Sequence, residues 1–303
     1  MSILPINNDL SICSPFCDYL NITSPKDNQD ALMRLIKPFL DVCGCLEVFE
    51  GTYSLPQASG TFKVSVRGQV SIFSASGGFL SALRAKGMYD AYLMVFADFQ
   101  YRISMMHVTV DFRVDAPEYI TNLYQKSTSG DIRLTSRFIK PQNVKQIIGK
   151  DEQGRDTGTV YLGNRANSDV WAKVYDKKQE RQSRGDSTFP PTLRIEIAVQ
   201  SDVGASLKDA SNPHDIFYYH AQHSLVTAPK GFKGWIPYGQ GFFTEKVNLD
   251  ITPWQQLKSI LEHSTDIKRF IDLANSSYGV DALKEMQKLL RHRYLLSERA
   301  IGA

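Results

Sequence analysis

The sequence predicts an α+β fold in which a mainly antiparallel sheet is flanked by helices. Residues 46–74 alternate between polar and apolar side chains and are rich in β-branched residues, as antiparallel strands are. Further strand-like segments at 105–115, 158–163, 169–176 and 192–200 follow without the regular spacing of βαβ units. The chain has 303 residues and 42% apolar content, which is enough for a large core.

The first half of the chain alternates between these strands and helices. CDYLNITSP, at 17–25, reads as a strand followed by turn chemistry. Residues 28–42 predict an amphipathic helix that Pro38 interrupts, and 79–100 predict a helix across a sheet face. The apolar stripe of the first helix consists of Leu32, Leu35, Ile36, Phe39 and Leu40.

The second half begins with a helix at 116–126, which has Pro117 near its start. Two strands at 132–139 and 143–149 are joined around Pro141. From about residue 250 the pattern becomes helical, with Thr252, Thr265 or Asp281 as caps. These changes predict an α+β domain over 1–205, an irregular aromatic and glycine-rich segment over 206–250, and a helical tail over 251–303.

Charge permits a nucleic acid as partner without requiring one. The net charge is +3 and the isoelectric point is about 8.5, whereas proteins that coat DNA are usually more basic. The basic side chains gather between residues 165 and 184, where six Lys or Arg stand against three Asp or Glu. The six are Arg165, Lys173, Lys177, Lys178, Arg181 and Arg184.

The four cysteines all lie in the first 45 residues, at Cys13, Cys17, Cys43 and Cys45. Their spacings are poor for a zinc site, so buried free thiols are the favoured interpretation. The sequence shows neither a signal-peptide pattern nor an apolar run near the roughly 20 residues that span a bilayer. We therefore expect a protein without a membrane partner, in the cytoplasm, or in the host cytoplasm if a phage encodes it.

Two strands carry the first candidate site. VTVDFRVD, at 108–115, places Asp111, Arg113 and Asp115 on one face, and LRIEIAVQ, at 193–200, places Arg194 and Glu196 on one face. Carboxylates at 111 and 115 lie about 13 Å apart along a strand and cannot both bind one ion directly. If the strands share a sheet, a polar patch results that suits Mg²⁺ or Mn²⁺. A solvated polar face or a cross-strand salt bridge remains the alternative.

The second candidate site is the segment 174–180, VYDKKQE. On a strand that runs into a turn or helix, Tyr175, Lys177 and Gln179 would alternate to one side. Tyrosine has a pKa of about 10, but a nearby cation stabilises the phenolate, which could then attack a phosphodiester while Lys177 and Lys178 hold the phosphate. A structural tyrosine beside solvated lysines is the alternative.

Several other chemistries lack their sequence motifs. The chain has no glycine-rich loop of the kind that cradles nucleotide phosphates, no Gly-X-Ser-X-Gly elbow and no His-hydrophobic-His triplet. Use of ATP and Ser-His-Asp hydrolysis are therefore not expected.

Taken in order, five segments resemble the replication initiation factors of rolling-circle plasmids and filamentous phages, a family that includes conjugative relaxases. Residues 17–23 (CDYLNIT) look like the opening strand, and 110–115 (VDFRVD) are similar to Arg-Ile-Asp-Leu-Ala-X-Asp. Residues 159–165 (TVYLGNR), with the serine at 168, resemble Thr-X-Tyr-X-Gly-Ser-Arg-X-Ser. Residues 174–180 resemble Tyr-Asp/Glu-Lys-X-X-Glu, and 194–196 (RIE) resemble Arg-X-Glu. The resemblance spans about 17–200.

This resemblance implies a fold related to the HUH endonucleases and a metal-dependent nick in one strand of single-stranded or cruciform origin DNA through a tyrosine. It implies Mg²⁺ or Mn²⁺ at the carboxylates and phosphate contacts from basic residues. The catalytic candidates are Tyr175, Tyr161 and Lys177. The DNA candidates are Arg165, Lys178, Arg113 and Arg194. The metal candidates are Asp111, Glu196 and Asp115.

The chain departs from the plasmid pattern at one position. Plasmid members read Tyr-Glu-Lys-X-Tyr-Glu, and Gln179 stands where they have the second tyrosine. Either Tyr175 or Tyr161 is the nucleophile, or another tyrosine is, or the protein does not nick. The alternatives to a nicking initiator are a non-catalytic origin-binding protein of the same fold and a mobilisation relaxase. Host helicase and polymerase are expected partners, and the tail could bind DNA or mediate a homodimer.

Overall fold

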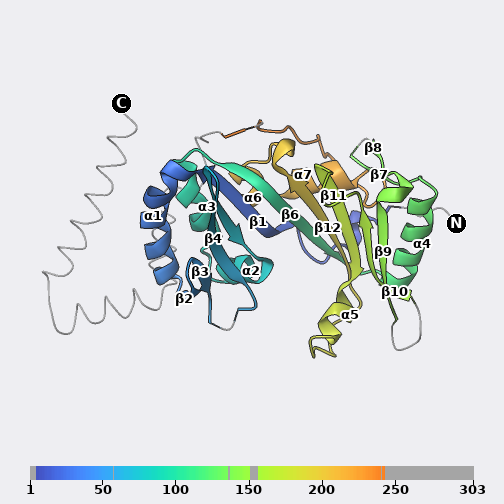
Figure 1. Ribbon diagram of the computed structural model, residues 1–303. Helices are drawn as coiled ribbons and strands as arrows, with labels where there is room; N and C mark the ends of the chain where they lie inside the picture. Colours follow the sequence, from blue (N-terminus) through green and yellow to red (C-terminus); the bar gives the residue numbers. More distant parts are fainter. Residues whose placement is uncertain (1–4, 57, 136, 151–155, 240, 243–303) are drawn as a thin grey trace, which may run out of the picture. The chain divides into compact units, whose positions relative to one another are not determined.

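The computed structural model describes residues 5–56, 58–135, 137–150, 156–239 and 241–242 (Figure 1). The chain divides into two units, Met1–Leu249 and Asp250–Ala303, and the second lies outside the described residues together with its predicted helices. The predicted division at 205 and 250 stays a prediction. Among the described residues, no helix is both long and apolar enough to cross a membrane.

The centre of the described unit is a ten-stranded sheet with the order β2-β3-β4-β5-β1-β6-β12-β11-β10-β9. Each neighbouring pair is antiparallel, which confirms the predicted α+β class. The strands are β1 Phe16–Pro25, β2 Leu46–Phe49, β3 Thr52–Ser54, β4 Thr61–Arg67, β5 Val70–Ala75, β6 Arg102–Phe112, β9 Val144–Lys150, β10 Asp156–Leu162, β11 Val170–Asp176 and β12 Leu193–Gln200. A second sheet pairs β7 Arg133–Leu134 with β8 Arg137–Phe138.

Helices connect and flank these strands. They are α1 Gln29–Val42, α2 Gly77–Ala85, α3 Tyr89–Ala97, α4 Ala116–Thr128, α5 Lys177–Gln182, α6 Leu207–Ser211 and α7 His214–Ala221. The single helix predicted over 79–100 is wrong. The chain breaks there at Gly87, whose φ of +66° is the left-handed conformation that ends helices. Pro38 does not end α1, which continues to Val42.

The two faces of the sheet differ. Apolar side chains such as Leu20, Val108 and Ile195 are fully buried on one face, where α4 packs on β10 and β11 and α7 packs on β6 and β12. Because side chains alternate along a strand, the residues between them point to the opposite face. That second face, which we call the open face, carries Asp111 and Arg194. The candidate residues therefore sit on the face away from these helices.

An aromatic cluster forms the core of the half that contains β1 to β5. The ring of Phe62, on β4, lies 5.7 Å from Phe79 and 5.9 Å from Tyr92, measured between centroids. A second pair, Phe73 and Phe96, lies 5.3 Å apart. This cluster joins β4 and β5 to α2 and α3, and α2 in turn lines one side of a cleft.

We expect Phe62→Ala to lower the free energy of unfolding by about 3–5 kcal/mol, because the substitution leaves a cavity around a fully buried ring. Phe49→Ala is the matched control, since Phe49 is 76% exposed and its loss should cost under about 0.5 kcal/mol. Urea unfolding of the three proteins measures both values. Equal effects of the two substitutions would contradict the core assignment.

Candidate active site

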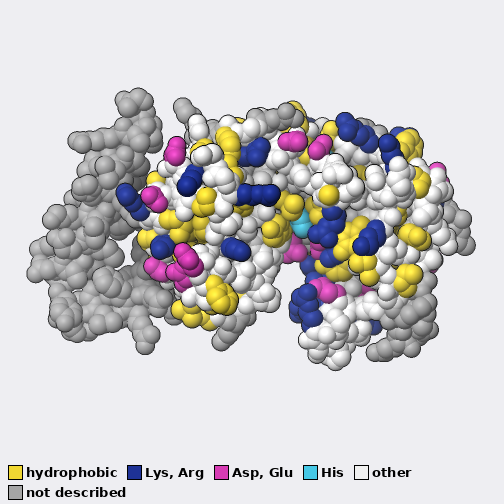
Figure 2. Space-filling model, viewed as in Figure 1, with side chains coloured by type: hydrophobic (Ala, Val, Ile, Leu, Met, Phe, Trp, Pro, Cys, Tyr) yellow, Lys and Arg dark blue, Asp and Glu magenta, His cyan; other side chains and the backbone are white. Residues whose placement is uncertain are grey.

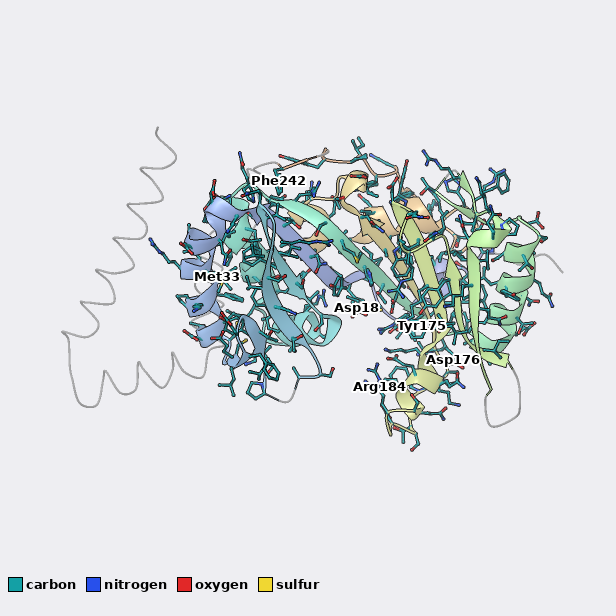
Figure 3. All side chains as sticks on the ribbon, viewed as in Figure 1. Asp18, Met33, Tyr175, Asp176, Arg184 and Phe242 are labelled. Atoms are coloured by element: carbon teal, nitrogen blue, oxygen red, sulfur yellow. The ribbon has the colours of Figure 1, made fainter. Side chains whose placement is uncertain are left out.

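A cleft of about 770 Å³ opens on the open face. One side is built from β1, β6, β11, β12 and α5, and the other from Leu55, Pro56, Ala58, Ser59 and the first turns of α2. Figure 2 shows the hollow at the centre of this face, and Figure 3 shows Asp18 and Tyr175 beside it. Charged or phenolic side chains that line it are Asp18, Lys86, Asp111, Lys173, Tyr175, Lys177, Glu180, Arg181, Arg184, Arg194 and Glu196.

An ion pair between β12 and β6 lies at the floor of this cleft. Arg194 and Asp111 are directly opposite each other in the strand register. The guanidinium donates from Nε to Oδ1 at 2.5 Å and from Nη2 to Oδ2 at 2.7 Å, which is the bidentate geometry that favours Arg over Lys. Burial alone would lower the pKa of Arg194, but its hydrogen bonds to Asp111, together with the charges of Asp111 and Asp18 and the nearby Tyr175, raise the pKa above its ordinary value. Arg194 is therefore a permanent cation in the cleft.

Tyr175 and Glu196 form the second contact. The Tyr175 hydroxyl donates to Oε1 of Glu196 at 2.7 Å, and both side chains are buried. Lys173 contacts both members of this pair, with Nζ 3.8 Å from Oε2 of Glu196 and 3.9 Å from the centroid of the Tyr175 ring. Burial and the charge of Glu196 raise the pKa of Tyr175 far above its usual value. The phenol is thus neutral, and its proton already points at a carboxylate.

The strand of Tyr175 runs into the helix α5, as the sequence allowed, so Lys177 and Gln179 do not continue the strand alternation of Tyr175. Asp176 ends β11 and caps α5, because its carboxylate accepts a hydrogen bond from the Gln179 amide at 3.0 Å. Lys177 is buried at the first position of α5 and donates to Glu180, which also accepts from Arg184 at 2.7 Å. Burial and the nearby charge of Arg194 lower the pKa of Lys177.

Asp18 is a cleft residue that the sequence analysis did not select. It is the extra residue of a β-bulge, since Cys17 pairs with Val108 and Tyr19 pairs with His107. The bulge places its Oδ2 atom 3.5 Å from Nη1 of Arg194. Burial raises the pKa of Asp18 to about 6; Glu196 adds to the rise, while Arg194 opposes it. An acid inside an otherwise apolar and aromatic stretch, Phe16–Leu20, was the available signal.

The neighbouring Gly77, at the start of α2, makes room for this carboxylate. A Cβ atom at that position would lie 2.3 Å from Oδ1 of Asp18 and 2.6 Å from its carbonyl oxygen. Glycine is therefore required here by close approach rather than by an unusual φ angle.

The remaining predicted residues do not line this cleft. The strand predicted over 105–115 ends at Phe112, so Arg113 and Asp115 do not continue the face of Asp111; both are exposed next to α4. The amide of Arg113 instead donates to the carbonyl of Leu10 at 2.9 Å.

Tyr161 and Arg165 line a separate pocket of about 300 Å³ beside β9 and β10. Lys178, on α5, is half-buried outside the lining of the cleft. The structure thus brings together Asp111, Tyr175, Lys177, Arg194 and Glu196 from the predicted set and adds Asp18, Lys173 and Glu180.

The donors in the cleft give a limited fit to a divalent ion. Asp18, Asp111 and Glu196 provide the hard oxygen ligands that Mg²⁺ and Mn²⁺ prefer. However, both oxygens of Asp111 accept from Arg194, and the part of the chain that the structure describes groups no three His, Cys, Asp or Glu side chains as ligands of one ion. As the side chains stand, the cation among these carboxylates is a guanidinium. The metal expectation stays a prediction, and no step below depends on it.

Comparisons with known proteins give structural likenesses at low similarity. No family model and no curated protein sequence matches the chain. A solved structure described as the rolling circle replication initiator protein from Geobacillus stearothermophilus has 16% identity and a TM-score of 0.44, with 83% of this chain and 96% of that chain covered. The di-domain ARO/CYC BexL from the BE-7585A biosynthetic pathway has 10% identity and a TM-score of 0.18, with 84% and 99% covered. At these TM-scores neither likeness identifies a family.

The raised pKa of Asp18 predicts a pH-dependent effect of Asp18→Asn. Because the folded-state pKa of about 6 exceeds the ordinary value of 3.8, the folded state binds this proton more tightly than the unfolded state. The contribution of Asp18 to the free energy of unfolding of wild type therefore falls as the pH rises between those two pKa values. The stability of Asp18→Asn relative to wild type should rise by about 1–3 kcal/mol between about pH 4 and about pH 7.5.

Urea unfolding at both pH values measures this difference. Asp30→Asn, on the exposed side of α1, controls for the loss of one carboxylate. A stability difference between Asp18→Asn and wild type that is the same at both pH values would contradict the placement of Asp18.

Proposed function

We propose that this chain is a rolling-circle replication initiator that nicks and reseals one strand of single-stranded or cruciform origin DNA through a phosphotyrosine intermediate. The observation that carries the proposal is the buried hydrogen bond from Tyr175 to Glu196 in a cleft that also holds Lys173, Lys177 and Arg194. A nucleophile, a proton acceptor and cations for a phosphate are thus within one cavity. The ordered sequence segments between 17 and 200 support the same activity.

The proposed step needs only groups present in the cleft. As the Tyr175 oxygen attacks phosphorus, Glu196 takes the phenolic proton, because its carboxylate already accepts that hydrogen bond. The new bond joins phosphorus to the tyrosine oxygen, and the bond from phosphorus to O3′ breaks. O3′ leaves as a hydroxyl after it takes a proton from the Lys177 ammonium. The reverse sequence reseals the strand and restores both protons.

We assign the nucleophile to Tyr175 rather than to Tyr161. Tyr175 lies 2.7 Å from a carboxylate inside the cleft, whereas Tyr161 lines the separate pocket and has its ring 6.3 Å from that of Trp171. The cations at the mouth of the cleft are suited to the phosphates on either side of the scissile bond. They are Lys173, Arg181 and Arg184. The predicted partners remain Mg²⁺ or Mn²⁺, the host helicase and polymerase, and a second copy of the chain.

A non-catalytic origin-binding protein is the second candidate function. One observation favours it: burial and Glu196 raise the pKa of Tyr175, so a free phenolate is disfavoured in this arrangement. In that case the same cleft would bind DNA without cutting it. The two functions differ in whether a covalent adduct forms, which the next experiment measures.

Tyr175→Phe should abolish the covalent adduct between the full chain and a single-stranded origin oligonucleotide, while Tyr161→Phe should retain it. The assay is denaturing electrophoresis with Mg²⁺, with Mn²⁺ and with chelator. Tyr124→Phe on the helix α4 is the control for loss of a hydroxyl elsewhere. Loss of the adduct only in Tyr161→Phe would move the nucleophile to that residue. Binding of wild type without an adduct under every metal condition would favour the non-catalytic function.

Glu196→Gln should slow adduct formation by about 10²–10⁴-fold, because an amide still accepts the hydrogen bond but cannot take the proton. Single-turnover rates with saturating oligonucleotide measure this effect. Glu118→Gln is the comparison for the loss of a carboxylate, since Glu118 is exposed in the first turn of α4 and does not line the cleft. An unchanged rate in Glu196→Gln would exclude Glu196 as the base.

A further inference from the structure

A row of four aromatic rings crosses the open face next to the cleft. Tyr161 on β10, Trp171 on β11, His107 on β6 and Tyr19 on β1 follow one another across the sheet. Ring centroids lie 6.3 Å apart for Tyr161 and Trp171, 5.2 Å for Trp171 and His107, and 5.0 Å for His107 and Tyr19. We call these four residues the aromatic row. The proposed nicking step does not use it.

Small residues let the row form. Ala198 on β12 pairs with both Trp171 and His107, so its methyl group leaves space for the two rings to meet over the strand between them. At Gly163, a Cβ atom would lie 3.1 Å from that of Trp171, and φ is +97°. A larger side chain at either position would separate the rings or crowd the tryptophan.

The aromatic row runs parallel to the residues of the cleft. Lys173 and Glu196 pair with each other on β11 and β12, two positions along the strands from Trp171 and Ala198. Two residues of strand correspond to about 7 Å. A single strand with one phosphate in the cleft could therefore place neighbouring bases over the aromatic row without leaving the open face.

The charges around the row favour a polyanion. The Arg165 guanidinium lies 5.0 Å from the Trp171 ring centroid and 5.6 Å from that of Tyr161. Lys145 on β9 and Lys173 on β11 both pair with Tyr161. Burial lowers the pKa of His107 to about 4, so its ring is neutral near pH 7 and offers a π surface rather than a charge.

Two polar atoms in the row lack a partner. Nε2 of His107 and Nε1 of Trp171 are buried and have no hydrogen-bond partner among the described residues. Buried polar atoms are usually paired, so these two carry a desolvation cost. Trp171 is only 2% exposed, whereas Tyr19, His107 and Tyr161 are partly exposed, so these three rings are the ones that a bound base can reach.

We propose that the aromatic row is a stacking platform for the bases of single-stranded DNA that flank the phosphate held in the cleft. Stacking on aromatic side chains tolerates any base, because every base has a π face. The platform rests on the proposed function, since it places the same DNA strand. In this arrangement the aromatic row contacts the bases, and the charged side chains of the cleft contact the phosphate.

The test measures equilibrium binding of a fluorescent oligothymidylate to the full chain at two salt concentrations. Tyr19→Leu, which removes the ring, should weaken binding by about 10-fold, while Tyr19→Phe, which keeps it, should stay within about twofold of wild type. Tyr124→Leu on α4 is the matched control and should bind as wild type does. Arg165→Gln should reduce the slope of log affinity against log salt concentration by the amount of about one phosphate contact. Tyr19→Leu should leave that slope unchanged.

Equal binding by Tyr19→Leu and wild type, or equal losses in Tyr19→Leu and Tyr19→Phe, would overturn the platform. Circular dichroism confirms that each variant is folded. The covalent-adduct assay keeps the two proposals distinguishable: binding that depends on the Tyr19 ring, without an adduct, supports the platform and contradicts the nicking function. An adduct together with binding that does not depend on the Tyr19 ring supports the nicking function and contradicts the platform.

Discussion

The ion pair between Arg194 and Asp111 is the interaction on which the candidate site depends. It joins two central strands of the sheet and places a fixed positive charge among three carboxylates, since Asp18 and Glu196 line the same cleft. Both partners are largely buried, with side-chain exposures of 11% and 15%. Removing one partner of such a pair leaves an uncompensated charge, at a cost of about 3–5 kcal/mol. The pair thus keeps a positive charge among the carboxylates of the cleft, which is compatible with a folded sheet and with a bound phosphate.

The rest of the cleft follows from how other charges distribute around this pair. Glu196 is balanced by Lys173 and hydrogen-bonded by Tyr175, so the carboxylate and the phenol lie together on neighbouring strands. Lys177 is held by Glu180 at the start of α5. Asp18 has only a distant contact with Arg194, and burial dominates its titration. Of these acids, Asp18 is the one whose charge is least compensated, which makes it the pH-sensitive element of the site.

In the proposed complex, the cleft and the aromatic row bind different chemical parts of a nucleic acid. Ionic side chains suit the phosphate, and rings suit the bases. Both are on the face of the sheet opposite the packed helices, and both use residues that alternate with buried apolar ones along the same strands. An antiparallel sheet with one packed face can therefore supply most of an extended binding surface, which residues 55–56 and 58–59, α2 and α5 complete at the cleft.

Local alternation in the sequence was enough to predict the central strands, their faces and five of the residues that line the cleft. It placed Arg194 with Glu196 on one face and Asp111 on the face of its own strand before any pairing was known. The pairing itself was decided by the tertiary structure, since strand register depends on contacts between distant residues. That register sets Arg194 opposite both Asp111 and Tyr175. In the tertiary structure β6 ends before Arg113, and a bulge in β1 places Asp18 in the cleft. Local periodicity carries no information on such long-range contacts, so Asp18 and the aromatic row emerged only from the folded chain.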